Sequence, residues 1–104
     1  MSKVYFGNRK VGDFKYPIRC LLDLTNKYIV LLEVPSNEMY SENVFCINKE
    51  GKLLWQIEKK KMPHSFSSYY GLDYNKNALL VYSSSIERLV DLNSGKILET
   101  DIVK

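Results

Sequence analysis

The sequence predicts an all-β protein made of two four-stranded antiparallel meanders and an N-terminal hairpin. Three observations support this fold class: short apolar runs with strand-like alternation, Gly- or Asn-containing turns between them, and an internal repeat. No stretch carries apolar residues at i, i+3, i+4 and i+7 over three turns, the spacing of an amphipathic helix. We expect eight to ten short strands, packed as a sandwich or a partly closed barrel.

The length and composition favour a single folded domain over residues 1–104. A chain of 12.1 kDa buries about two-thirds of its unfolded surface on folding, which is enough for a modest core. With 45% hydrophobic residues and a formal net charge of +3, the composition is not that of a disordered chain. No apolar run has the length of a membrane span, and the first ten residues lack the apolar core of a secretory signal. We therefore expect a cytoplasmic protein without a membrane segment.

The first strands are predicted from alternation and from turn residues. Residues 3–6 and 11–14 flank Gly7-Asn8 and form a plausible hairpin. Residues 18–24 alternate, which suits a strand with one buried face, whereas 28–34 are apolar on both faces and suit a strand covered on both sides. We interpret the polar stretch 36–43 as a loop with at most one helical turn.

The later strands follow the same logic. We predict them at 44–48, 53–58, 67–74, 78–83, 86–92 and 97–103. Polar turns at 25–27, 49–51, 75–77 and 93–95 separate consecutive strands, and their Gly or Asn residues adopt positive φ at low cost. The three prolines all fall between apolar runs, as expected because proline cannot donate to a sheet ladder.

Self-comparison shows that the chain contains two copies of one unit. Residues 22–32 align without gaps on 72–82, and 43–56 align on 87–100. Each copy reads as strand, tight turn, strand, variable loop, strand, Gly-containing turn and strand. The first repeat spans about residues 18–58 and the second about 66–103, with a basic linker between them.

The Gly-Lys turn of each repeat resembles a motif of β-propeller blades of the pyrroloquinoline-quinone type. Residues 47–55 read INKEGKLLW, with Asn48 in the position where the blades carry Asp. Residues 91–99 read DLNSGKILE and have Glu99 where the motif carries Trp. The resemblance implies twisted blade-like meanders and nothing about chemistry. Because a propeller closes with roughly four to eight blades, two blades cannot form the central channel, and no cofactor or catalytic residue is carried over.

Candidate catalytic residues are sparse. His64, the only histidine, lies in the linker without a Cys or carboxylate at metal-ligand spacing, so we interpret it as a solvent-exposed loop residue. A Ser-His-Asp arrangement needs a serine near His64 or from 83–85, yet no G-x-S-x-G nucleophile elbow is present. Trp55, the only tryptophan, is predicted to pack between the sheets.

The cysteines and strand-end carboxylates have structural interpretations. Cys20 and Cys46 lie in separate apolar strands without a C-x-x-C motif, which is typical of buried reduced thiols. Asp23, Asp73 and Asp91 each end a strand beside a turn. Paired acids at equivalent repeat positions could act in glycoside hydrolysis, but acceptance of turn N–H groups explains them more economically.

Basic residues suggest one alternative binding site. The net charge is +4 over residues 1–19, −3 over 20–58, +3 over 59–77 and −1 over 78–104. If the hairpin and the linker lie on the same side, Arg9, Lys10, Lys59, Lys60 and Lys61 form a candidate anion-binding patch. This patch would bind nucleic acid or another polyanion.

The preferred functional hypothesis is a non-enzymatic protein-binding or self-associating module. Meanders in a chain too short to close a ring leave strand edges, and pairing with another chain uses them. The partner is then an unidentified protein or a second copy in a homodimer. Nucleic-acid or polyanion binding through the basic residues is the alternative. Neither hypothesis requires a metal or cofactor.

Overall fold

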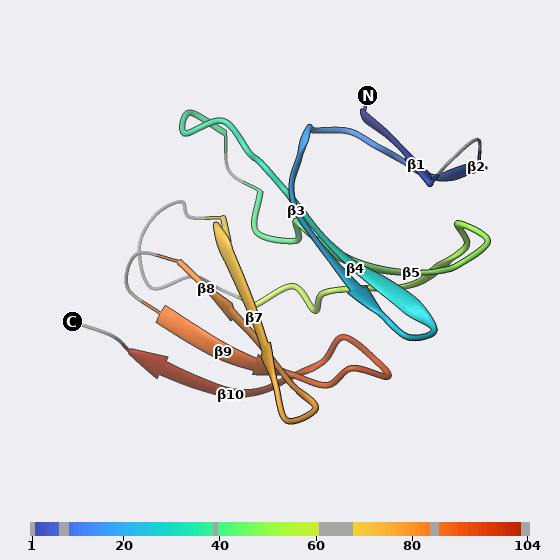
Figure 1. Ribbon diagram of the computed structural model, residues 1–104. Coiled ribbons are helices and arrows are strands. Elements are labelled where there is room, and N and C mark those ends of the chain that lie inside the picture. Colours follow the sequence, from blue (N-terminus) through green and yellow to red (C-terminus); the bar gives the residue numbers. More distant parts are fainter. Residues whose placement is uncertain (1, 7–8, 39, 61–67, 84–85, 103–104) are drawn as a thin grey trace.

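The computed structural model describes residues 2–6, 9–38, 40–60, 68–83 and 86–102, and within these ranges the regular structure is entirely β (Figure 1). Ten strands follow one another along the chain: β1 (Ser2–Phe6), β2 (Arg9–Phe14), β3 (Ile18–Leu24), β4 (Lys27–Leu32), β5 (Val44–Asn48), β6 (Leu53–Gln56), β7 (Gly71–Asn75), β8 (Ala78–Tyr82), β9 (Ile86–Val90) and β10 (Ile97–Ile102). The described residues include no helix long and apolar enough to cross a membrane. The predicted N-terminal hairpin is confirmed, because β1 and β2 pair antiparallel.

The other eight strands form two four-stranded antiparallel meanders, as predicted. The first sheet has the order β3-β4-β5-β6 and the second β7-β8-β9-β10, so each strand pairs with its neighbours in sequence. The sheets stack as a sandwich, with the first above the second in Figure 1, and the ten described strands do not close into a barrel. Their facing sides share one hydrophobic core, built mainly from Ile29, Leu31, Val44, Cys46, Trp55 and Ile57 of the first unit and Tyr69, Leu79, Val81, Ile86, Val90 and Ile97 of the second.

The strand register confirms that the two sheets are similar meanders. Ile29 of β4 pairs with Cys46 of β5, and Leu79 of β8 pairs with Val90 of β9. These pairs keep the offsets of 50 and 44 found by aligning the sequence with itself. The turn glycines that the alignment matches, Gly51 and Gly95, both have positive φ, 89° and 77°. The two units therefore share the register of their two central strands and a positive-φ glycine in the last turn as well as the sequence pattern.

One detail of the sequence alignment was wrong. The ungapped alignment placed Glu99 at the position of Trp55, whereas the register makes Ile97 the counterpart of Trp55. Trp55 pairs with Cys46, and Ile97 pairs with Val90, the equivalent of Cys46. The counterpart moves by two residues for two reasons. The bulge beside Leu54 in β6 adds one residue before Trp55, and the turn of the second unit is one residue shorter, because Ile47 pairs with Leu53 whereas the N–H of its equivalent, Asp91, donates to the Lys96 carbonyl.

Several strands differ in extent from the prediction. The strand expected at 11–14 begins at Arg9, and those expected at 53–58 and 86–92 end at Gln56 and Val90. The strand expected at 28–34 ends at Leu32, where the chain turns toward Pro35. The strand expected at 67–74 begins only at Gly71, because the backbone of Tyr69 bonds to a side chain of the first unit instead of to a neighbouring strand. The predicted loop at 36–43 contains a turn at 36–38.

The two sheets differ in how their outer faces are covered. A second hydrophobic cluster packs on the outer face of the first sheet and comprises Phe14, Tyr16, Tyr28, Val30, Leu32 and Ile47. Phe14 ends β2, and its ring lies 5.2 Å from that of Phe45 in β5, so the end of the hairpin covers this face. Tyr40, from the loop between β4 and β5, adds to the same cluster. No second cluster packs on the outer face of the second sheet among the described residues.

Candidate functional site: the open face of the second sheet

The outer face of the second sheet is the candidate site. Along β8 and β9, buried residues alternate with partly exposed ones, so Leu80, Tyr82, Glu87 and Leu89 point away from the core. The register places Leu80 and Leu89 side by side, flanked by Asp73 of β7 and Glu99 of β10. A neighbouring row contains Gly71, Tyr82, Glu87 and Asp101. We call Asp73, Leu80, Tyr82, Glu87, Leu89, Glu99 and Asp101 the open face.

The open face combines an apolar centre with negative charge. Its four carboxylates come from Asp73, Glu87, Glu99 and Asp101. The only Lys or Arg within β7–β10 is Arg88, which is buried and points into the core. The face therefore carries a formal charge of −4 with no compensating cation from its own strands.

Two tyrosines pack at one end of this face. The ring of Tyr82 lies directly over Gly71, where an added Cβ would come within 2.1 Å of Tyr82 Cε2. Only glycine allows this approach, so Gly71 makes the position of the Tyr82 ring possible. The ring of Tyr70 meets that of Tyr82 edge-on at 5.8 Å between centroids, and Tyr70 remains 46% exposed. The two rings therefore form an aromatic border on the open face, on the same side of the sheet as its carboxylates.

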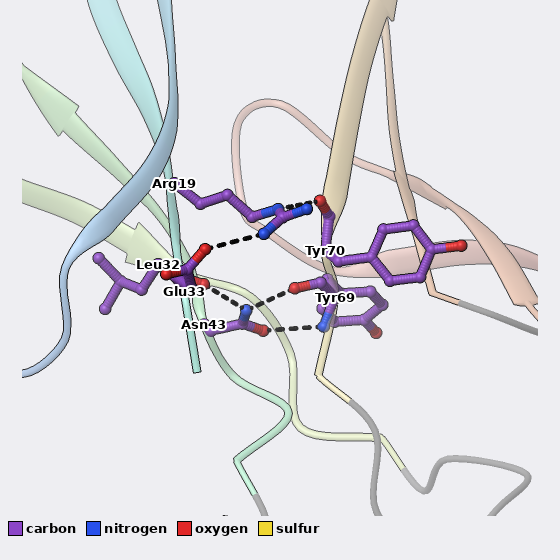
Figure 2. Close-up of polar contacts among 6 residues, drawn as sticks. All are labelled: Arg19, Leu32, Glu33, Asn43, Tyr69 and Tyr70. Atoms are coloured by element: carbon purple, nitrogen blue, oxygen red, sulfur yellow. Dashed lines mark hydrogen bonds and ion pairs between the residues drawn. The ribbon is translucent and has the colours of Figure 1, made fainter. Parts of the chain in front are cut away.

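The buried side-chain amide of Asn43 links the second unit to the first just before β7 (Figure 2). We call its hydrogen bonds to Leu32 and Tyr69 the clamp. Asn43 Nδ2 donates to the carbonyl oxygens of Leu32 at 2.9 Å and Tyr69 at 2.7 Å. Asn43 Oδ1 accepts from the backbone N–H of Tyr69 at 3.2 Å. Asn43 is fully buried, so these bonds satisfy groups that water does not reach.

An arginine holds the next residue of the same segment. Arg19 of β3 donates from Nε to the carbonyl oxygen of Tyr70 at 2.7 Å and from Nη1 to Glu33 Oε1 at 2.9 Å (Figure 2). The backbone N–H of Tyr70 donates to the carbonyl oxygen of Tyr82 at 3.0 Å. The backbone of Tyr70 is thus fixed from both sheets, which positions its ring at the border of the open face.

A buried arginine lies on the inner side of the second sheet. Arg88 donates from Nη1 to the Tyr69 hydroxyl at 2.7 Å and from Nε to Thr100 Oγ1 at 3.1 Å. Burial raises the pKa of Tyr69 above its ordinary value, and the nearby guanidinium opposes this rise. The phenol therefore stays neutral at physiological pH, and its oxygen accepts the hydrogen bond from the Arg88 guanidinium. These polar residues hold together the end of the sandwich that contains the clamp.

The predicted anion-binding residues belong to two separate segments, and their convergence into one patch stays a prediction. Lys59 and Lys60 are exposed, and Lys61 lies outside the described residues. The backbone of Arg9 and Lys10 belongs to β2 in the hairpin, at the upper right of Figure 1. The end of β2 covers the outer face of the first sheet, whereas the chain just before Lys59 bonds to the turn that precedes β10 of the second sheet.

The cysteines and the histidine, which the sequence analysis considered for redox or catalytic roles, belong to different parts of the chain. Cys20 and Cys46 are free and lie in β3 and β5, with β4 between them. Burial raises the pKa of the Cys46 thiol, which makes it unreactive. His64 lies outside the described residues, which contain no group of three His, Cys, Asp or Glu side chains placed to hold a metal.

The three strand-end aspartates have different environments. Asp91 accepts the backbone N–H of Asn93 at 2.7 Å, which confirms the predicted turn role. Asp23 instead pairs with the ammonium group of Lys49, and that group also lies 3.8 Å from the centroid of the Tyr28 ring. Asp73 is exposed on the open face. The aspartates at equivalent repeat positions, Asp23 and Asp73, therefore lie on the outer faces of different sheets.

Comparison with known proteins identifies the family. The model of the family named Domain of unknown function (DUF7957) matches residues 2–102. The chain belongs to this family. The match extends from β1 to β10, so the DUF7957 domain includes the hairpin and both sheets. No curated protein and no solved structure matches the chain significantly.

Sequence reasoning missed the open face of this DUF7957 domain, and the sequence signal for it is mixed. Glu99 and Asp101 alternate along β10, but in β9 the polar residues Glu87 and Arg88 are adjacent and lie on opposite faces. Alternation shows which residues share a face, but it does not show which face is covered. That depends on the position of the hairpin and of the 33–43 loop, which both pack on the first sheet.

Proposed function

We propose that this DUF7957 domain is a non-enzymatic protein-binding module and that the open face of its second sheet is the binding surface. The single observation that supports the proposal is the unequal covering of two similar sheets. Leu80 and Leu89 form an apolar centre with charged residues around it, a composition typical of protein interaction sites. Their equivalents in the first sheet, Val30 and Phe45, are covered by the second hydrophobic cluster.

The way the two units stack supports a single docking surface. The first strands of the units adjoin through the bond from Arg19 to the Tyr70 carbonyl. The units also meet near their last strands, where Trp55 Nε1 donates to the Leu92 carbonyl at 2.8 Å. We propose that each unit is propeller-like in its strand order, although the two units pack equivalent faces on each other, with Ile29 and its counterpart Leu79 both in the shared core. The hairpin occupies one outer face of the pair, so the other remains for a partner.

The proposal includes no catalysis and places the domain in the cytoplasm. Two unpaired cysteines suit a compartment that keeps thiols reduced. The carboxylates of Asp23 and Glu58 accept a lysine ammonium and the Ile97 backbone N–H respectively, so both serve in structural contacts. Protein binding then requires only shape and charge, which the open face supplies.

The test compares a variant of the open face with a matched control elsewhere. The double variant Leu80→Ser/Leu89→Ser removes the apolar centre, whereas Leu53→Ser/Leu54→Ser changes two exposed leucines of β6. Proteins captured from the source cells by the unaltered domain are identified, and one is purified and titrated by calorimetry. We expect at least tenfold weaker binding for the open-face variant, equivalent to about 1.4 kcal/mol, and unchanged binding for the control.

Thermal melts show whether each variant is folded. Equal affinity of a folded open-face variant and the unaltered domain contradicts the proposal. Loss of binding in the β6 control alone also contradicts it and moves the binding surface to the edge of the first sheet.

A further inference from the structure

We infer that the open face binds a cationic surface of another protein, in which Lys or Arg side chains surround apolar residues. This inference rests on the proposed function and names the chemistry of the partner. Charge complementarity is the main argument. The open face carries −4, while the whole chain carries +3, so the remainder of the chain carries +7. The negative charge is thus concentrated on the one sheet face that no described cluster covers.

The same charge disfavours a second copy as the occupant. A two-fold symmetric dimer places the same patch of both copies in contact. Packing open face on open face would bring eight carboxylates into one interface, with no Lys or Arg from β7–β10 to separate them. Opposed like charges cost several kcal/mol at an interface. A partner of opposite charge has the reverse effect, because it gains from the same four groups.

The arrangement of the residues specifies how a cation would dock. Asp73 and Glu99 lie at the two ends of the row that contains Leu80 and Leu89. A Lys or Arg stem can cover the leucines while its charged end reaches a carboxylate at the border. In the adjacent row, Glu87 and Asp101 are paired residues of β9 and β10, so a second cationic group can reach two neighbouring carboxylates. Apolar contact and charge contact are thus available to the same partner segment.

The experiment uses two defined peptide probes and the full chain labelled with 15N. One probe is a capped heptapeptide of alternating Lys and Leu, and the other is its counterpart with Glu in place of Lys. We expect the lysine peptide to shift the amide resonances of β8 and β9 and the glutamate peptide to leave them unchanged. Raising NaCl from 20 to 300 mM is expected to weaken lysine-peptide binding at least fivefold, because exposed charges are screened over shorter distances.

Matched charge variants sharpen the result. Glu99→Gln/Asp101→Asn removes two carboxylates of the open face, and Glu42→Gln/Glu50→Gln removes two from loops of the first unit. Both pairs change the net charge equally. We expect the first pair to weaken lysine-peptide binding five- to tenfold and the second pair to change it less than twofold. Equal weakening by both pairs indicates attraction to net charge alone and overturns the inference.

Three other results also overturn the inference. Equal shifts with both peptides indicate apolar docking without charge selection, and the proposed function then survives. Shifts of the same amides on concentrating the domain alone identify a second copy as the occupant. If neither peptide shifts β8 or β9, the cationic partner is rejected. The Leu80→Ser/Leu89→Ser titration then decides separately whether the open face binds protein at all.

Discussion

The two sheets are near copies, and the comparison between them shows where function arises in this domain. They share strand order, the register of their two central strands and a positive-φ glycine in the last turn. Val30 and Leu80 occupy equivalent places on the two outer faces, yet Val30 is fully buried and Leu80 is partly exposed. The difference comes from what lies above each sheet. The same meander is therefore a core element when covered and a candidate binding surface when open.

A second difference concerns the facing sides of the sheets. Val44 of β5 is apolar and fully buried, whereas its equivalent in β9 is Arg88. Arg88 contacts Tyr69, and the backbone of Tyr69 is bonded by Asn43. One end of the sandwich is thus joined by polar contacts, while the centre is joined by apolar ones. This arrangement fixes the second sheet relative to the first through specific hydrogen bonds as well as through packing.

The largest difference in stability is expected when a lysine is placed at equivalent positions on the two outer faces. Val30→Lys buries an ammonium under the second hydrophobic cluster, and an unpaired buried charge costs several kcal/mol, enough to prevent folding. In Leu80→Lys the side chain reaches solvent, and Glu87 and Glu99 carry opposite charge on the same face. We expect Leu80→Lys to fold with a loss below about 1.5 kcal/mol, measured by urea unfolding. Similar behaviour of both variants would contradict the difference in covering.

Trp55 and its counterpart Ile97 give the next largest effect. Trp55 is buried, packs against Gly95 and donates to the Leu92 carbonyl, so it connects the sheets. We expect Trp55→Ala to lower the free energy of unfolding by about 3–5 kcal/mol and Ile97→Val by about 1 kcal/mol. The exposed neighbour Leu54→Ala is the control and should change stability by less than about 0.5 kcal/mol. Calorimetric melts of the three variants test this ranking.

We expect removal of the clamp to lower the free energy of unfolding by less than removal of the Trp55 side chain. Asn43→Ala leaves the Leu32 carbonyl and the backbone of Tyr69 without their side-chain partner. We expect a loss of about 2–3 kcal/mol, because buried polar groups are then unsatisfied. The equivalent residue of the second unit is Glu87, and Glu87→Ala should change stability by less than about 0.5 kcal/mol. Equal losses in chemical denaturation would show that the clamp contributes nothing beyond an ordinary surface residue.

Alkaline pH is expected to produce the smallest and most gradual loss of stability. Burial raises the pKa of Cys46 above 9.0 and that of Tyr69 above 10.0, so the fold favours their neutral forms. Their contribution is complete below pH 9 and is lost as pH rises through the raised values. For Cys46 the slope approaches about 1.4 kcal/mol per pH unit. Urea unfolding from pH 7 to 11 should show this decline, with a later onset in Cys46→Ala. A flat profile to pH 11 contradicts it.

The sequence predicted the fold largely because strand patterns are local. Alternation, turn residues and the repeat indicated eight to ten strands with two four-stranded meanders, and the hairpin followed from the runs on either side of Gly7. Bulges were not predicted, since an extra residue in an edge strand leaves no distinct local pattern. The alignment matched Trp55 with Glu99, while the register matches it with Ile97, because the Leu54 bulge and the shorter last turn of the second unit each shift the pairing by one residue. The beginning of β7 was misplaced because Tyr69 bonds to Asn43, 26 residues away.

The sequence by itself determined the strands, the duplication and the residues that share each face, because a pleated strand alternates its side chains regardless of what surrounds it. Only the tertiary structure decided which of the two outer faces meets solvent. The hairpin and the 33–43 loop cover the first sheet, and this placement depends on long-range packing around Phe14 and Tyr40. Whether an outer face is covered depends on how the whole chain folds. For this reason Val30 is buried and Leu80 is partly exposed, although their strands are otherwise similar.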